Sequence, residues 1–146
     1  MTSIQRSALV PYSDHEMYQL VADIPSYPAF LPWCGGARIV TRAPEMVVAE
    51  IGIAYKGVHK TFTTRNLLQP DKMMEMQLVE GPFRHLHGYW RFTPLDALAS
   101  KIALDLEFEV ANRLLAMMLT PVFSGIATDL VEGFRRRAVA LYGARG

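Results

Sequence analysis

Apolar and polar positions follow different periods in successive parts of the chain. Residues 3–11 are typical of a strand that ends at Pro11. Ser13 then opens the stretch Ser-Asp-His-Glu, a capping box in which Glu16 stands three residues after the capping serine. Apolar residues at helical spacing follow it. We therefore predict a short amphipathic helix over residues 14–23.

The segment from Ser26 to Gly36 has neither strand alternation nor the length of a helix, and it reads Ser-Tyr-Pro-Ala-Phe-Leu-Pro-Trp-Cys-Gly-Gly. Pro25 prevents continuation of the preceding helix, and residues 26–31 can form one more helical turn, with Ser26 as its cap, before Pro32 ends it. Three aromatic residues then lie on one side of that turn: Tyr27, Phe30 and Trp33.

Between residues 36 and 110 the period changes to two. The runs are separated by the turn signals Gln69-Pro70-Asp71, Gly81-Pro82 and Pro94-Leu95-Asp96. Apolar residues alternate with polar ones, which predicts strands with one buried and one solvated face, the pattern of an antiparallel sheet. A parallel sheet would instead show continuous apolar runs.

The last third of the sequence predicts one long helix over residues 112–142. Pro121 lies inside it and is expected to kink it or split it in two, and Gly143 is a plausible C-terminal stop. The apolar residues that recur every three or four positions are Leu115, Leu119, Val122, Phe123, Ile126, Leu130 and Phe134.

These elements predict an α+β fold with a pocket. A helix is only about 10–12 Å wide and strands lie about 4.8 Å apart, so one long helix cannot cover the apolar face of seven flat strands. The sheet must curve around the helix, and the remaining concave volume must be filled by small elements or by a ligand. The predicted lining is Ile51, Ile53, Tyr55, Phe62, Met74, Met76, Trp90, Phe92, Met118 and Val122.

Composition narrows the class of protein. The chain has 146 residues, of which 51% are hydrophobic and 20% charged, so we expect a single globular domain over residues 1–146. A net charge of +1 does not indicate a nucleic-acid binder, and no specific DNA contact is expected. The single cysteine, Cys34, favours a reducing compartment.

The N-terminus lacks the features of a signal peptide, and the sequence shows no uniformly apolar, uncharged window of 18 residues. We expect a cytoplasmic location, with transient contact at the inner membrane surface left open.

Candidates for catalysis are few, and each has a simpler interpretation. His85 and His87 share the wet face of a strand, which favours a solvated pair over a metal site. Cys34 has no evident base and is better explained as a small buried residue. The acidic row Asp105, Glu107 and Glu109 alternates with apolar residues and fits an outer face. We therefore predict no catalytic residue, no metal and no cofactor.

Two basic features of the sequence each allow two interpretations. Arg135 to Arg137 fit either a solvated helix end or a contact with nucleic acid or ribosome. Lys60 shares its parity with Val58 and Phe62, so it either points inward to orient a polar head group or extends into solvent at a strand end.

Three stretches carry a family resemblance: SALVPYSDHEMYQLVADIPSYPAFLPWCGG, KTFTTRN and EGPFRHLHGYWRF. Together with the long terminal helix they resemble the START-like (polyketide cyclase-like, SRPBCC) domains of the coenzyme-Q-binding proteins and of the RatA group. The latter is named for a bacterial toxin that interferes with ribosomal subunit association. The matching positions are Pro28, Phe30, Leu31, Pro32, Trp33 and Cys34, and Phe62, Gly81, Pro82, Phe83, Leu86, Trp90 and Phe92. Phe30, Leu31, Trp33, Leu86 and Lys60 join the predicted pocket lining as ligand-binding residues.

The resemblance implies a helix-grip fold, in which a seven-stranded curved antiparallel sheet wraps a long C-terminal helix and two short helices follow the first strand. It also implies non-catalytic binding of ubiquinone or a related isoprenoid lipid in support of respiration, which is the preferred hypothesis. The alternative is a RatA-type toxin that binds the large ribosomal subunit, and the third is an enzyme of the cyclase or dehydratase type. The alternative needs a continuous basic surface, for which the available residues are Arg135 to Arg137, Arg84, His85, His87 and Arg91. The segment from Ser26 to Gly36 then either gates the cavity or plugs that end of the core.

Overall fold

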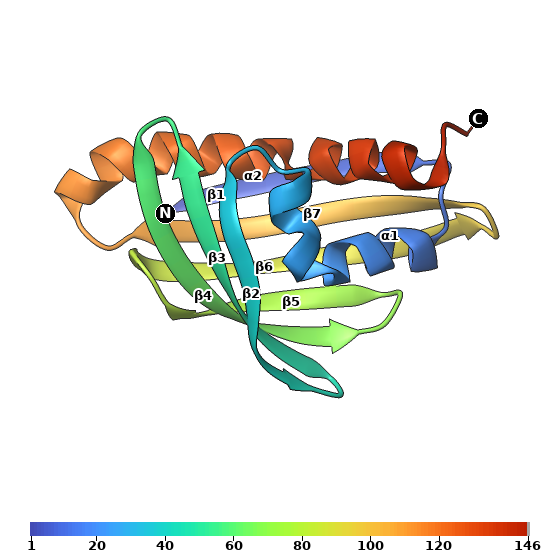
Figure 1. Cartoon of the computed structure of the whole chain (residues 1–146), viewed down its shortest axis with the longest axis horizontal. Helices are drawn as coiled ribbons and strands as arrows, with labels where there is room; N and C mark the ends of the chain where they lie inside the picture. The colour runs from blue at the N-terminus through green and yellow to red at the C-terminus, as the bar shows by residue number, and fades with distance from the viewer. Residues whose placement is uncertain (146) are drawn as a thin grey trace.

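A curved antiparallel sheet under one long helix dominates the computed structural model, which describes residues 1–145 (Figure 1). The elements, in chain order, are β1 Thr2–Val10, α1 Asp14–Ala22, the 3₁₀ helix η1 Ile24–Ala29, β2 Cys34–Ala43, β3 Met46–Tyr55, β4 Val58–Gln69, β5 Met73–Glu80, β6 Phe83–Asp96, β7 Ala99–Val110 and α2 Arg113–Tyr142.

The sheet contains seven strands in the order β1-β7-β6-β5-β4-β3-β2, and every neighbouring pair is antiparallel. The first strand therefore pairs with the last one. In Figure 1, α2 runs along β1, β6 and β7, whereas the directions of β2, β3 and β4 make a steep angle with it. The sheet thus curves around the helix, as the width argument predicted, and the α+β helix-grip architecture is confirmed.

The capping box at the first helix is confirmed. The Ser13 hydroxyl accepts a hydrogen bond from the backbone N–H of Glu16 at 3.0 Å, and the Glu16 carboxylate accepts one from the backbone N–H of Ser13 at 2.9 Å. Glu16 also pairs with Arg145 at 2.8 Å, which ties α1 to the chain beyond α2. This pairing and the cap together hold the pKa of Glu16 below its usual range.

The predicted cap at Ser26 is wrong. The 3₁₀ helix begins two residues earlier, at Ile24, because Pro25 has the backbone angle of a first helical turn and lacks the N–H that such a turn leaves unpaired. The Ser26 hydroxyl instead donates to the carboxylate of Asp23. The turn ends where the N–H of Phe30 bonds to the carbonyl of Tyr27, before Pro32.

Alternation along the strands produces the core. On β3 and β7 the residues of one parity are buried and those of the other are more exposed, so the sheet has one dry face and one wet face. The concave dry face also buries polar residues, Thr64 and Asn66 on β4 and Ser100 on β7. At the turn before β6, Gly81 has a φ of 152°, and a Cβ there would lie 2.6 Å from the Cβ of Phe62.

The long helix begins at Asn112, whose side chain accepts from the N–H of Leu115, and ends at Gly143, which has a φ of 86°. Helical residues continue through Pro121, so the helix is not split. Its length and composition alone would allow it to cross a membrane. Its buried positions fall on one stripe that faces the sheet, from Leu119 to Ala138.

The capping geometry generates a stability prediction. Replacing Ser13 with alanine removes the acceptor for the Glu16 N–H, and we expect a loss of about 1 kcal/mol in the free energy of unfolding. Replacing Ser26 with alanine removes only an exposed contact with Asp23, so we expect a loss below about 0.5 kcal/mol. Urea unfolding of both variants measures the difference; equal losses would contradict the assignment of Ser13 as the cap.

Candidate functional site

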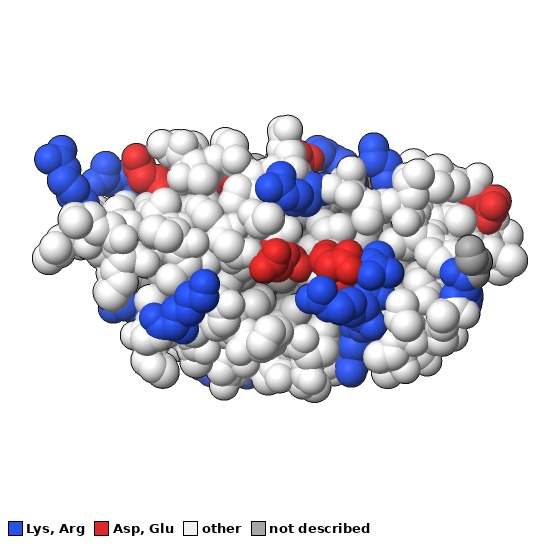
Figure 2. Space-filling model, turned by 90° about the horizontal axis from the view of Figure 1, so that it is seen from above, with Lys and Arg blue, Asp and Glu red and all other residues white. Residues whose placement is uncertain are grey.

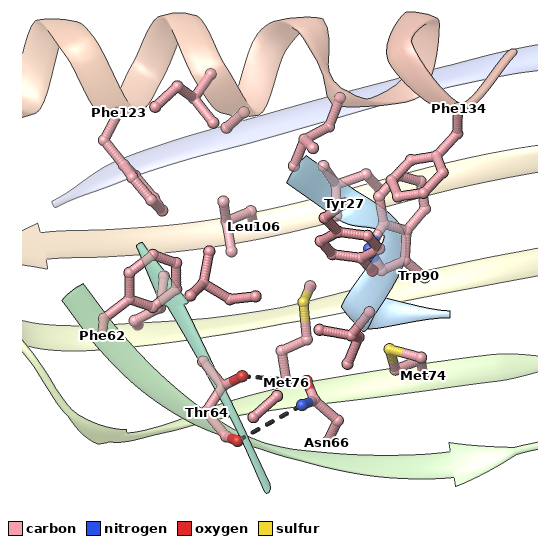
Figure 3. Close-up of a pocket in the computed structure, with 18 of the residues that line it drawn as sticks. Tyr27, Phe62, Thr64, Asn66, Met74, Met76, Trp90, Leu106, Phe123 and Phe134 are labelled. Carbon is pink, nitrogen blue, oxygen red and sulfur yellow. Dashed lines mark hydrogen bonds between the residues drawn. The ribbon is translucent and has the colours of Figure 1, made fainter. Parts of the chain in front are cut away.

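A small cavity lies between the concave face of the sheet and α2, with a volume of about 80 Å³. Its walls come from η1, the loop before β2, strands β3 to β7 and α2, and they are almost entirely apolar (Figure 3). The lining residues are Ile24, Tyr27, Trp33, Ala49, Ile51, Phe62, Thr64, Asn66, Met74, Met76, Leu86, Trp90, Leu104, Leu106, Phe123, Ile126, Ala127, Leu130 and Phe134.

Aromatic clusters anchored by two phenylalanines of α2 enclose the cavity. The ring of Phe134 packs edge-on against three others, Tyr27 at 5.4 Å, Phe30 at 5.4 Å and Trp90 at 5.3 Å between centroids. Phe123 similarly contacts Phe62, Phe83 and Phe108 at 5.9, 4.9 and 4.7 Å. Three helical turns of about 3.6 residues separate the two phenylalanines, so both project from one face of α2.

Thr64 and Asn66 form the polar part of the wall, on the side opposite α2 (Figure 3). The Thr64 hydroxyl donates to the Asn66 side-chain carbonyl at 3.3 Å, and the Asn66 amide donates to the carbonyl of Val47 at 3.2 Å. These bonds satisfy two groups that would otherwise be costly to bury. No charged side chain lines the cavity, so its wall disfavours a charged occupant.

Tyr27 closes the cavity on the side of η1. Its hydroxyl donates to the backbone carbonyl of Val21, and burial raises the pKa of Tyr27 far above its usual range. The phenol is therefore neutral at physiological pH. It acts as a structural link between η1 and α1, and its geometry gives no indication of an acid catalyst.

An outer recess of about 130 Å³ adjoins the cavity. It lies among the loop before β2, the β3–β4 turn and the middle of α2, and it shares Trp33 and Ile126 with the cavity wall. The two side chains therefore separate the outer recess from the cavity. The recess is more polar than the cavity, since Lys56, Asp129 and Arg136 contribute to it.

The structure brings seven of the residues predicted from sequence to the cavity wall: Trp33, Ile51, Phe62, Met74, Met76, Leu86 and Trp90. Six of them come from strands, where parity assigns the buried face directly, and Trp33 comes from the loop before β2.

Eight others lie elsewhere, which corrects their predicted position: Phe30, Leu31, Ile53, Tyr55, Lys60, Phe92, Met118 and Val122. Leu31, Tyr55 and Val122 line the outer recess. Phe30 packs on the outer side of Phe134, and Phe92 is buried between Trp90 and Tyr18. Ile53 and Lys60 border an open depression near the end of β3.

The error for Met118 and Val122 is one of helix rotation. Met118 is 51% exposed, whereas the neighbouring stripe through Leu119, Phe123 and Ile126 is buried. One residue corresponds to about 100° on a helix, so an assignment shifted by one position moves a side chain from the cavity to the surface.

Sequence reasoning missed the polar pair and most of the helix lining. Strand parity contained the signal for Thr64 and Asn66, because both share the parity of Phe62 and Leu68. The periodic stripe of α2 likewise already contained Phe123, Ile126, Leu130 and Phe134. Tyr27 was assigned to the aromatic segment but not to the site. No local signal marks Leu104 and Leu106 as nearer the cavity than other buried positions of β7.

The described residues, 1–145, show little that could catalyse a reaction. They contain no cluster of three or more histidine, cysteine, aspartate or glutamate side chains able to hold a metal. His85 and His87 contact Glu107 at 3.0 Å and Glu75 at 2.8 Å on the outer face of the sheet. Cys34 is buried, and burial raises the pKa of its thiol, which disfavours the nucleophilic thiolate.

Residues 10–135 match the family model described as polyketide cyclase / dehydrase and lipid transport. The chain belongs to this family. It is 46% identical over 99% of its length to the ribosome association toxin RatA of Escherichia coli strain K12, of which the match covers 92%. It is also 26% identical over 94% of its length to a mitochondrial coenzyme Q-binding protein, COQ10 homolog B of Xenopus laevis, of which the match covers 58%.

Solved structures agree with the fold of this polyketide cyclase-like domain. The Zhui aromatase/cyclase from Streptomyces sp. R1128 superposes with a TM-score of 0.83 at 19% identity, covering 99% of each chain. A START superfamily protein from Mycobacterium smegmatis gives a TM-score of 0.80 at 19% identity, over 95% of this chain and 98% of its own. At such identities the likeness establishes the START-like fold alone.

The ring contacts generate a second stability prediction. Phe134→Leu removes three edge-on contacts, each worth about 0.5–1.5 kcal/mol beyond its buried area, so we expect a loss of about 2–3 kcal/mol in the free energy of unfolding. Phe30→Leu affects a half-buried ring, and we expect a loss below about 1.5 kcal/mol. Urea unfolding compares the two variants. An equal or larger loss of stability for Phe30→Leu would show that Phe134 is not the central ring of this aromatic cluster.

Proposed function

We propose that this protein is a ribosome association factor of the RatA type that binds a ribosomal subunit and blocks subunit joining. The observation that carries the proposal is the 46% identity to the E. coli RatA toxin along almost the whole of both chains. The identity to the coenzyme Q-binding relative is only 26%. This contrast reverses the order of the two leading sequence hypotheses, since quinone binding was preferred over the RatA role.

The proposed mode of action is binding without catalysis, in the cytoplasm where ribosomes are assembled from their subunits. The absence of a metal-binding cluster among residues 1–145 and the protonated, buried Cys34 are compatible with it.

The outer face of the sheet is a poor candidate for contact with ribosomal RNA. Arg84, His85, His87 and Arg91 looked from sequence like parts of a basic surface. Each faces a carboxylate at 2.7 to 3.7 Å, on Glu109, Glu107, Glu75 and Asp105 respectively. Paired cations attract phosphate weakly, because the neighbouring acid cancels their field.

The C-terminal half of α2 is a better candidate. Of the three consecutive arginines Arg135 to Arg137, the first two share the partner Glu132, which Arg135 contacts at 2.9 Å and Arg136 at 3.9 Å. Arg137 lies 4.8 Å above the ring of Phe30. Figure 2 looks down on this side of the molecule and shows Lys and Arg side chains gathered beside acidic ones near its middle. We propose this arginine turn as the contact with ribosomal RNA phosphates.

The cavity supports a second candidate function, binding of an apolar small molecule. The family description includes lipid transport, and the cavity wall is apolar apart from Thr64 and Asn66. A pocket for a drug-sized ligand is about 300–1,000 Å³, so the present 80 Å³ holds a small group only. A ubiquinone ring would need movement of wall side chains, for which the flexible Met74 and Met76 are suited.

Subunit association assays test the first proposal. Purified protein should lower the fraction of bacterial subunits that join into whole ribosomes in sucrose gradients. Arg136→Gln/Arg137→Gln should weaken this effect about tenfold and lower its salt dependence by about one unit per lost phosphate contact. The matched control is Arg84→Gln/Arg91→Gln, which removes the same charge from the sheet face and should change the effect less than about twofold. Equal losses in both variants would remove the arginine turn from the proposal. If the unmodified protein does not lower subunit joining, the proposal itself is overturned.

Ligand uptake tests the second candidate function, binding of an apolar small molecule. Ala127→Leu places a larger side chain in the cavity, where Ala127 is fully buried, so uptake of added ubiquinone or other apolar ligands should fall by about tenfold or more. Ala140→Leu makes the same change at an exposed position of α2 and should leave uptake unchanged. Native mass spectrometry measures both, and an empty cavity in the unmodified protein under all conditions would contradict this candidate.

A further inference from the structure

The first turns of α2 expose an apolar surface that the proposed function does not use. Leu114 is 79% exposed, Met117 75% and Met118 51%. Spacings of three and four residues place these side chains on one face of the helix. In Figure 1 this part of α2 extends beyond the strands at the left end of the molecule. Only 28% of the most apolar 18-residue window of α2 is buried, so a substantial part of this helix is not core.

Two cations lie at the start of the helix that bears this apolar face. Arg113 is the only ionisable residue between Asn112 and Thr128, and the first turn contains no acid. Arg84 donates to the carbonyl of Ala111 at 3.2 Å, which places its guanidinium beside the start of the helix. The view in Figure 2 shows mostly uncharged atoms at the same end, with basic side chains and an acidic one beside them at its edge.

A third cation approaches from the sheet. Lys56, at the β3–β4 turn, lies by the outer recess with Pro121 and Val122 of α2. The nearby acids are Glu109, 3.7 Å from Arg84, and Asp129, on the far side of the same recess. Arg84 is paired with Glu109, whereas Arg113 and Lys56 form no salt bridge among residues 1–145.

Size and charge favour a lipid surface over a second protein chain. A stable protein–protein interface takes about 20–30 residues from each partner, whereas three large apolar side chains form this surface. An apolar helix face bordered by cations is the pattern of helices that lie at a membrane interface, where anionic head groups attract the cations. We propose that the first turns of α2 dock on an anionic lipid bilayer, with Leu114, Met117 and Met118 entering its interfacial layer and Arg113 and Lys56 facing the head groups.

The docking end is continuous with the route into the cavity. Along α2, Met118 precedes Pro121, Val122 and Gly125 of the outer recess, and Ile126 then separates the recess from the cavity. Pro121 has no N–H to offer the carbonyl of Met117, so the exposed turns lack one helical hydrogen bond to the rest of α2. Docking therefore brings the recess to the membrane side of the molecule without requiring the buried stripe to move.

Exposed leucines at the opposite end of the molecule provide a matched control. Leu95 and Leu98, at the β6–β7 turn, are 54% and 70% exposed. Asp96 lies between them and accepts the backbone N–H of Leu98 at 2.7 Å. The apolar exposure is similar, but an acid replaces the cations, so this turn should not bind an anionic surface.

Vesicle flotation tests the docking surface. The unmodified protein should float with vesicles of phosphatidylglycerol and phosphatidylcholine mixed at about one to three, and binding should fall at high salt and with phosphatidylcholine alone. Leu114→Gln/Met117→Gln should lower binding to the anionic vesicles about tenfold or more, because two exposed side chains lose their apolar contact. Leu95→Gln/Leu98→Gln should bind within about twofold of the unmodified protein.

Other occupants of the surface give different results. The inference is overturned if the unmodified protein fails to bind anionic vesicles. It is also overturned if the two variants lose binding equally. A dimer in sedimentation that Leu114→Gln/Met117→Gln abolishes, with vesicle binding intact, would assign the surface to a second copy. Loss of ribosome co-sedimentation by that variant, again with vesicle binding intact, would assign it to the ribosome. The arginine-turn variant Arg136→Gln/Arg137→Gln tests the proposed function separately, since its substitutions lie outside the apolar surface. Failure of membrane docking can therefore be told apart from failure of ribosome binding.

Discussion

The structure depends on one packing constraint, the coverage of a seven-stranded apolar face by a single long helix. A helix about 10–12 Å wide covers little more than two strands at about 4.8 Å spacing. The sheet therefore bends around α2, and the aromatic rings anchored by Phe123 and Phe134 fill most of the concave space that remains. The small cavity is what these two clusters leave between them.

The same helix divides the molecule into an inner and an outer part. Its inner stripe closes an apolar cavity whose polar groups are the hydrogen-bonded Thr64 and Asn66, and the wall offers no base, thiolate or metal cluster among the described residues. Its outer side has a basic turn at Arg135 to Arg137 and an exposed apolar end around Met117. The proposed contacts with the ribosome and with a membrane both lie on the outer side, whereas the proposed binding of small apolar molecules belongs to the inner side.

Sequence patterns predicted the sheet and its buried face because a strand has a period of two, which parity identifies without ambiguity. Ile51, Phe62 and Trp90 were placed on the cavity wall in this way. The helix was harder, since a shift of one residue rotates a side chain by about 100°, and Met118 was assigned inward although it is exposed. The size of the cavity depends on how the rings interlock, and no residue pattern contains that information. The choice between quinone and ribosome came from overall identity rather than from any motif, because both groups share the fold.

If the protein acts on ribosomes, its contact with them should lie on the outer side of α2. A cryo-electron microscopy map of the protein bound to a bacterial ribosomal subunit would locate that contact. We expect the turn from Arg135 to Arg137 to face ribosomal RNA, while the outer face of β5, β6 and β7, with its paired charges, faces solvent. A map in which that sheet face contacts the RNA and the arginine turn is free would refute this assignment.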